Sequence, residues 1–174
     1  AQVRCIAFSN TEEALVVPIR AIDGTPIVNG TLIDPLRKEI AKELRSPDLF
    51  VLGHNAGQYD RLVCEQWLGI TPQLAADTLI LHLLADNELP HNLGFVGSFY
   101  TDNPEAWKAD HTATEAKSNK ELHVYCAKDA CVTARIATPL AQDVKKRSQQ
   151  HLLAREHMLQ WLGVAMQRTG MEVD

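Results

Sequence analysis

Two side chains on one predicted helix are of the kinds that perform acid–base or metal chemistry. The stretch ELHVYCAKDACVT, residues 121–133, is largely apolar, yet it carries a phenol at Tyr125 and a carboxylate at Asp129. Because they are four residues apart, the two side chains share one helix face, one turn above the other. A carboxylate flanked by Ala127 and Ala130 either faces solvent or needs a partner. The pair therefore indicates a helix face that lines a site.

A second polar group follows a predicted strand in VLGHNAGQYDRLV, residues 51–63. An apolar run ends at Gly53, and the loop after it places Asn55, Tyr59 and Asp60 at the start of the next helix. In open α/β sheets, ligands bind beyond the carboxyl ends of the strands. These three side chains are therefore candidates for the same site.

Each of these residues also has a purely structural interpretation. An aspartate in the first turn of a helix, as Asp60 is, usually caps the helix or interacts with its dipole. Tyr125 would then be a half-buried aromatic residue whose hydroxyl bonds to the backbone. Only the combination of residues can favour a functional site.

The strands expected to support this site are short. Residues 3–9 and 14–19 are predicted to form two strands joined by the polar turn NTEE, as in a hairpin. LFVLG, residues 49–53, is a continuous apolar run, as expected of a strand covered on both faces. The helix after it is expected to begin near Tyr59.

Helix signals mark the segments before and after this strand. Asp34 as a cap and Pro35 in the first position predict a helix over residues 34–45. Asp77 is expected to cap a helix over residues 77–85. The expected buried stripe of the first helix consists of Leu36, Ile40 and Leu44.

Two further helices are predicted near the end of the chain. One starts near Lys120 and is expected to kink or end before Pro139. The other covers residues 148–168 and stops at Gly170. The order of hairpin, helix, strand and further helices predicts an α/β domain.

Composition limits the possible functions. The chain has 174 residues, of which 45% are hydrophobic and 22% charged, as in an average soluble domain. It has neither an apolar run of membrane-spanning length nor a secretory signal, so a cytoplasmic protein that does not contact a membrane is expected. The net charge of −5 argues against a protein that coats nucleic acid. It is compatible with an enzyme whose carboxylates hold metal ions. The cysteines lack metal-site spacing and are expected to be reduced thiols: Cys5, Cys64, Cys126 and Cys131.

Together, the two polar stretches resemble the 3′–5′ exonucleases of the DEDD superfamily. The pattern is HN-(x)3-YD after a buried strand, followed by Y-x3-D on a helix; the tyrosine marks the DEDDy branch. DTLILHLL lies where such domains carry a helix between the two motifs. The segment ELPHNLGFVGSFYTDNPEAWK resembles the segment that follows in phage-type family A DNA polymerases. The ending MQRTGMEVD resembles the point where those polymerases pass from the proofreading exonuclease domain into the thumb. The resemblance covers nearly the whole chain.

This resemblance implies an RNase H-like (DnaQ-like exonuclease) fold, with a mixed sheet flanked by helices. Residues 1–147 would form the exonuclease domain, and residues 148–174 would form a helix leading towards a polymerase thumb. The expected partners are the 3′ end of single-stranded DNA and a polymerase domain in the same parent chain. The expected compartment is the cytoplasm of a bacterial or phage-infected cell.

The resemblance also assigns roles to the candidate residues. Asp60 and Asp129 correspond to metal ligands, and Tyr125 to the phenol that orients the attacking water. Asn55 and Tyr59 correspond to positions near the bound 3′ end. Two divalent ions, Mg²⁺ or Mn²⁺, about 3.5–4 Å apart would activate the water and stabilise the leaving oxygen in the complete domain. These two ions would explain the polar helix face.

One motif of the superfamily is missing from this sequence. The D-x-E of the first strand should precede the hairpin, but no D-x-E appears in an early strand. We therefore expect the first strand to be absent and the chain itself to be inactive or nearly so. Two alternatives stay open. One is a non-catalytic pseudo-exonuclease that acts as a structural or DNA-contact module, and the other is an RNase D-like ribonuclease.

Overall fold

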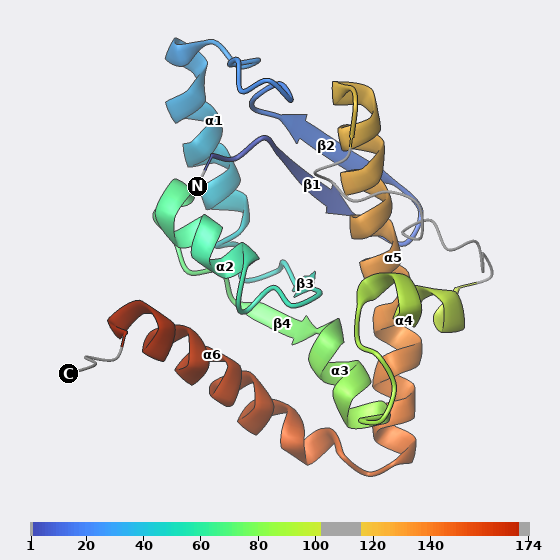
Figure 1. The fold of residues 1–174 in the computed structure, drawn as a ribbon. Helices are drawn as coiled ribbons and strands as arrows, with labels where there is room; N and C mark the ends of the chain where they lie inside the picture. The colour runs from blue at the N-terminus through green and yellow to red at the C-terminus, as the bar shows by residue number, and fades with distance from the viewer. Residues whose placement is uncertain (1, 102–115, 171–174) are drawn as a thin grey trace.

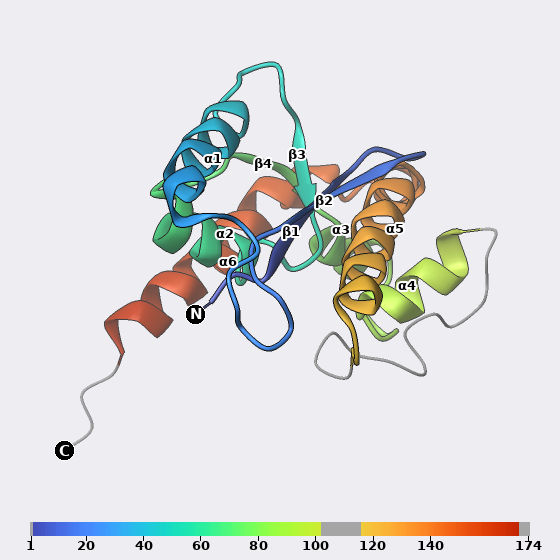
Figure 2. The same cartoon turned by 90° about the horizontal axis from the view of Figure 1, so that it is seen from above.

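The computed structural model describes residues 2–101 and 116–170. Figure 1 shows α5 running down one side of the molecule, α1 on the opposite side, and α6 crossing below β4. Seen from above, the strands lie between α1 and α5, with α4 outside α5 (Figure 2). The named elements are β1 (Cys5–Ser9), β2 (Ala14–Pro18), α1 (Gly30–Glu43), β3 (Val51–Gly53), α2 (Asp60–Val63), β4 (Leu74–Asp77), α3 (Thr78–Ala85), α4 (Leu93–Tyr100), α5 (Asn119–Lys146) and α6 (Leu153–Thr169).

The predicted hairpin is confirmed. β1 and β2 pair antiparallel, with Cys5 opposite Pro18 and Ser9 opposite Ala14. The side chain of Asn10 accepts hydrogen bonds from the amides of Glu12 and Glu13 and so closes the NTEE turn. Both strands are slightly shorter than predicted, since β1 begins at Cys5 and β2 ends at Pro18.

The helix predicted over residues 34–45 begins four residues earlier than expected. Asn29 caps it by accepting a hydrogen bond from the Thr31 amide, so Asp34 is not the cap. Pro35 lies inside α1, not at its first position. In the predicted stripe, Ile40 is buried, while Leu36 and Leu44 are half-buried.

The strands form two separate pairs. β3 pairs in parallel with β4, which sequence reasoning did not predict, and a register irregularity lies between Val51 and Leu52. Among the described residues, no strand joins this pair to the hairpin. The expectation that LFVLG is covered on both faces is wrong, because Phe50 is 81% exposed and Leu52 is 39% exposed. A mixed α/β fold is therefore established, with two small sheets.

α2 and α3 follow the sequence prediction closely. α2 begins at Asp60, next to the expected Tyr59, and continues as a π-helical stretch over Cys64–Leu68. Asp77 caps α3, as predicted, by accepting a hydrogen bond from the Leu79 amide. Both α2 and α3 therefore start beside the carboxyl end of the β3–β4 pair.

α5 is longer than predicted. It continues through Pro139 to Lys146, so the expected end before the proline is wrong. After a 3₁₀ turn at Gln150–Leu152, α6 runs to Thr169, and Gly170 follows with a φ of 71°. The predicted stop signal at Gly170 is confirmed.

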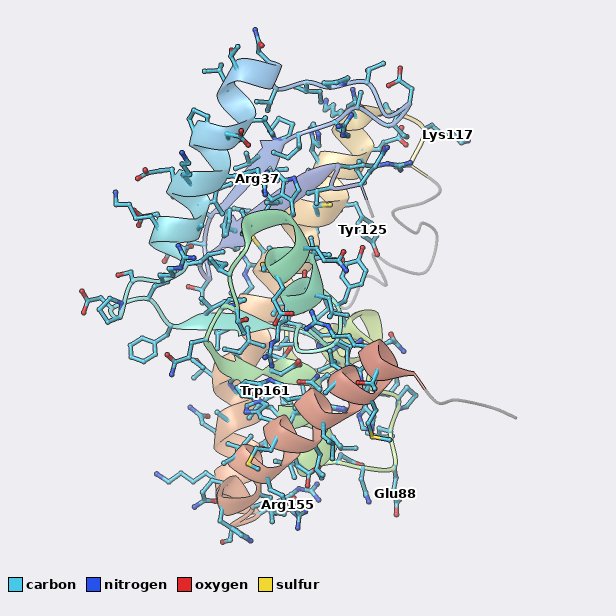
Figure 3. The ribbon with its side chains drawn as sticks, turned by 90° about the vertical axis from the view of Figure 1, so that its left-hand side faces the viewer. Arg37, Glu88, Lys117, Tyr125, Arg155 and Trp161 are labelled. Carbon is cyan, nitrogen blue, oxygen red and sulfur yellow. The ribbon has the colours of Figure 1, made fainter. Side chains whose placement is uncertain are left out.

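α6 packs back on the rest of the molecule. The guanidinium of Arg61 lies 4.2 Å from the ring centroid of Trp161, and Arg168 pairs with Glu65. Figure 3 shows Trp161 on the side of α6 that faces the rest of the molecule. The boundary between residues 147 and 148 stays a prediction. Parts of the polymerase-like segments, residues 102–108 and 171–174, lie outside the described residues.

The hydrophobic core lies between α3, α4 and the C-terminal half of α5. These helices meet through aliphatic side chains that are almost entirely excluded from solvent. The core consists of Ile80, Leu81, Leu84, Ala85, Leu93, Val96, Ile136, Leu140 and Val144.

No described helix is both long and apolar enough to cross a lipid bilayer.

Candidate functional site

The loop after β3 forms a tight turn. A Cβ atom on Gly53 would overlap that of Ala56, so glycine is required for the chain to fold back at this point. Asn55 adopts a φ of 59°, a left-handed conformation that asparagine tolerates better than most residues. Its carbonyl accepts from the amides of Gln58 and Tyr59. This turn directs the chain into α2 and so positions Tyr59 and Asp60.

One buried carboxylate holds this loop in place. Asp77 is 0% exposed, and its Oδ1 accepts from the Asn55 amide at 2.8 Å and the Leu79 amide at 3.0 Å. Its Oδ2 accepts from the Gly57 amide at 3.4 Å and from Gln160 Nε2 at 3.1 Å. Asp77 therefore joins the loop, the start of α3 and one residue of α6.

Two histidines extend this network. The amide of Asp77 donates to His157 Nε2 of α6 at 3.2 Å. His54 Nδ1 lies 2.9 Å from Thr78 Oγ1, and His54 Nε2 lies 2.9 Å from the carbonyl of His91. The backbone on both sides of the loop is thus held by neighbouring elements.

Asp60 lies near two other carboxylates. Burial of its carboxyl group, opposed by a backbone hydrogen bond and assisted by the charges of Asp77 and Asp129, raises the pKa of Asp60 to about 6. Although the residue as a whole is exposed, protein atoms crowd the carboxyl end. Three acids from separate segments therefore place negative charge in one region.

The helix face singled out in the sequence belongs to the N-terminal half of α5. Tyr125 and Asp129 are both half-buried, and Thr133 Oγ1 donates to the carbonyl of Asp129 at 2.8 Å. The hydrogen bond to Cys5, then burial and then the charges of Cys5 and Asp129 raise the pKa of Cys126. In Figure 3, Tyr125 lies nearer the hairpin end of the molecule than Trp161 does.

The candidate residues thus come from two places. Asn55, Tyr59 and Asp60 belong to the β3–α2 segment, and Tyr125 and Asp129 belong to α5. The electrostatic interaction of Asp60 with Asp129 connects the two segments. Tyr59 is 67% exposed, so its ring faces solvent beside Asp60.

Sequence reasoning missed part of this arrangement. It assigned Asp77 a capping role only, although the same carboxylate also holds the loop. His157 and Gln160 were not singled out, because nothing in the spacing of α6 connects them to a residue about 80 positions earlier. The signal available in the sequence is that polar residues follow both β3 and β4, where each strand leads into a helix.

The described residues fit a divalent ion only in part. Carboxylates that repel each other, such as Asp60 and Asp129, are the kind of ligand that Mg²⁺ prefers. Asp77 is a poor third ligand, because four N–H donors already bind its oxygens. In residues 2–101 and 116–170, no group of three His, Cys, Asp or Glu side chains is arranged to hold a metal.

A separate hollow lies at the other end of α3. Its volume is about 430 Å³, and the walls combine aromatic, acidic and basic side chains. On one wall, Tyr100 donates from its hydroxyl to Asp143 Oδ2 at 2.9 Å. The lining residues are His82, Ala85, Asp86, Leu89, Phe99, Tyr100, Asp143, Lys146 and Arg147.

Comparison of the chain with protein-family models, curated proteins and solved structures gave no match. The functional argument therefore depends on the residues and their geometry.

Proposed function

We propose that the chain is the 3′–5′ exonuclease domain of a family A DNA polymerase, with a site that is incomplete in this sequence. The observation that carries the proposal is the proximity of Asp60 and Asp129. The charge of Asp129 can raise the pKa of an acid so far away in the sequence only if the fold brings the two carboxylates near each other. A cation bound between them would relieve that repulsion.

The proposed reaction is hydrolysis of the terminal phosphodiester of a single DNA strand. Water adds to phosphorus, the bond to the 3′ oxygen breaks, and that oxygen takes up a proton. The products are a 5′-mononucleotide and a shortened strand. Divalent ions, when bound, supply water activation and leaving-group stabilisation.

The residues of this chain have separate roles in the proposal. Asp60 and Asp129 hold a divalent ion by their carboxylate oxygens. Tyr125, one helical turn before Asp129, orients the attacking water through its hydroxyl. Tyr59, with its exposed ring, stacks on the 3′-terminal base, and the side-chain carboxamide of Asn55 forms a hydrogen bond to the strand.

The most direct test is binding of Mn²⁺, measured by calorimetry or by water-proton relaxation. We expect saturable binding that Asp60→Asn and Asp129→Asn each weaken at least tenfold. Asp34→Asn is the matched control, because Asp34 is an exposed acid on α1, away from the site. Unchanged Mn²⁺ binding in both site variants would refute the proposal.

Catalysis is tested with 3′-labelled single-stranded DNA and with RNA of the same sequence. Because only two carboxylates are available for two ions, we expect weak DNA hydrolysis that Tyr125→Phe and Asp129→Ala reduce further. Preferential digestion of RNA would instead support the ribonuclease alternative.

The non-catalytic alternative has one observation in its favour, the lack of a three-ligand metal group among the described residues. It predicts DNA binding that does not respond to Mn²⁺ or to Asp129→Asn. With a net charge of −5, metal-independent affinity for DNA should be low and should fall steeply with salt.

A further inference from the structure

Two thiols that are far apart in the sequence lie in contact. Cys5 Sγ on β1 and Cys126 Sγ on α5 are 3.3 Å apart, although the residues are separated by 121 positions. Both residues are half-buried, so this part of the structure is partly exposed to solvent. Close thiols on two different elements are the arrangement from which a disulfide can form.

The neighbouring contacts fix how β1 lies along α5. Ser9 Oγ is 3.1 Å from Cys131 Sγ, and Arg135 Nε donates to the carbonyl of Thr11 at 2.8 Å. The Cys5–Cys126, Ser9–Cys131 and Thr11–Arg135 contacts follow the same order along the hairpin and along α5. The thiol pair therefore belongs to a packed interface with a defined register.

We propose that Cys5 and Cys126 are a reversible redox pair, which closes to an intramolecular disulfide on reaction with a small-molecule disulfide such as oxidised glutathione. The Cys5 thiolate attacks one sulfur of glutathione disulfide, forms a mixed disulfide and releases one glutathione thiolate. The Cys126 sulfur, after loss of its proton, attacks the Cys5 sulfur and releases the second glutathione. The two protein thiols are oxidised, the glutathione disulfide is reduced, and the two protons go to the released glutathiones.

The surroundings favour Cys5 as the first nucleophile. The hydrogen bond with Cys126 lowers the pKa of Cys5, burial opposes this, and Arg4 lowers it further. For Cys126, the hydrogen bond with Cys5 and burial both raise the pKa. Cys5 on β1 is therefore the attacking thiol, and Cys126 on α5 is the resolving thiol.

The other two cysteines serve as internal controls. Cys131 contacts the hydroxyl of Ser9, which cannot form a disulfide. Cys64 lies in the π-helical stretch, where burial and the charges of Asp60 and Glu65 raise its pKa to about 11. Neither has a thiol partner comparable to the 3.3 Å pair.

The disulfide would connect the hairpin to the helix that carries the candidate site. Cys126 follows Tyr125 directly and lies three residues before Asp129. A crosslink that closes so long a loop restricts the unfolded chain strongly, so the oxidised protein should melt about 10 °C higher than the reduced one. This prediction does not depend on the exonuclease proposal.

The test uses a Cys64→Ser/Cys131→Ser double variant of the whole chain, which keeps the pair intact. After incubation with oxidised glutathione, we expect loss of both free thiols, one crosslinked Cys5–Cys126 peptide in the mass spectrum, and the rise in melting temperature. Dithiothreitol should reverse all three. A glutathione adduct that persists, or a crosslink between two molecules, would overturn the proposal.

Single variants provide the second arm. Cys5→Ser and Cys126→Ser in the otherwise unchanged chain should each abolish the crosslink and the rise in melting temperature. Circular dichroism verifies that each variant is folded, and Cys5→Ala replaces Cys5→Ser if it is not. An unchanged oxidative rise in melting temperature in either folded variant would contradict the assignment of the pair.

Discussion

The helical region and the strand region of this molecule are built differently. Where α3, α4 and the C-terminal half of α5 meet, Val96, Ile136 and Leu140 are each 0% exposed. Among the described residues, the strand region, which comprises the β1–β2 hairpin and the β3–β4 pair, has no comparable core. All five residues of β1 are half-buried, and Leu15 of β2 is 64% exposed. We infer that most of the free energy of unfolding comes from the helical region.

The same comparison separates stability from chemistry. The acids Asp60, Asp77 and Asp129 gather in the strand region or at its border with α5. Repulsion between carboxylates lowers the free energy of unfolding, and binding of a cation can raise it again. The packing of the helical region compensates for the stability that this repulsion removes.

The largest expected effect is a cavity in the helical core. Ile136→Ala should lower the free energy of unfolding by about 4 kcal/mol, because it removes a fully buried side chain and leaves a cavity between packed helices. Leu15→Ala, the matched change in the hairpin, should alter it by less than about 0.5 kcal/mol. Urea denaturation measures both. Equal losses of unfolding free energy in the two variants would contradict the inference that the helical region contributes most of the stability.

The next effect comes from the loop network. Asp77→Ala removes the cap of α3 and leaves the amides of the half-buried Asn55 and the buried Gly57 without their acceptor. A loss of about 3 kcal/mol is expected. Asp77→Asn keeps one acceptor oxygen and should lose about half as much. A loss under about 1 kcal/mol in Asp77→Ala would mean that the loop is held by other contacts.

Tyr100 probes the border of the helical core. Tyr100→Phe should cost about 1 kcal/mol by removing the hydrogen bond to Asp143. Burial, then the hydrogen bond and charge of Asp143, raises the pKa of the phenol to about 12. Ultraviolet titration of Asp143→Asn should therefore show Tyr100 ionising at lower pH. An unchanged titration would exclude the interaction.

The smallest effect concerns the charge in the strand region. The folded pKa of Asp60, about 6, lies above its unfolded value of about 3.9, so the folded state binds the extra proton between these pH values. Stability should then fall as the pH rises from about 4 to about 6.

Asp60→Asn should remove this fall in metal-free buffer. The gain at pH 7 is expected to be less than about 1 kcal/mol, because solvent reaches the residue and screens its charge. Melting temperatures across this pH range measure the change, with Asp34→Asn as a control that should keep the wild-type profile. A variant that is less stable than wild type at pH 7 would contradict the assigned cost of burying the Asp60 charge beside two other carboxylates.

Much of the fold follows from local signals. The hairpin was predicted from two apolar stretches around a polar turn, and α3 from an aspartate before an apolar helix. The start of α1 was missed because Asn29 and Asp34 are both good caps, and the tertiary structure uses the earlier one. α5 passes through Pro139 because its buried C-terminal half packs against α3 and α4. Packing there outweighs the local cost of the proline.

The candidate site could be predicted only where its residues follow one another in the chain. Asn55, Tyr59 and Asp60 were found together, as were Tyr125 and Asp129. β4 was missed because LAAD is short and has weak strand propensity, and the role of Asp77 in the loop depends on its pairing with β3. Contacts with α6 depend on tertiary packing and leave no periodic signal in the sequence.

α5 belongs to both regions, and this has a consequence for how the molecule opens. Its N-terminal half borders the weakly packed strands, whereas Ile136, Leu140 and Val144 anchor its other end. Amide protons of a single helix would then exchange with solvent by two routes, local opening near Tyr125 and global unfolding beyond Thr133. The boundary between the two cooperative units would fall inside a continuous helix, close to Asp129.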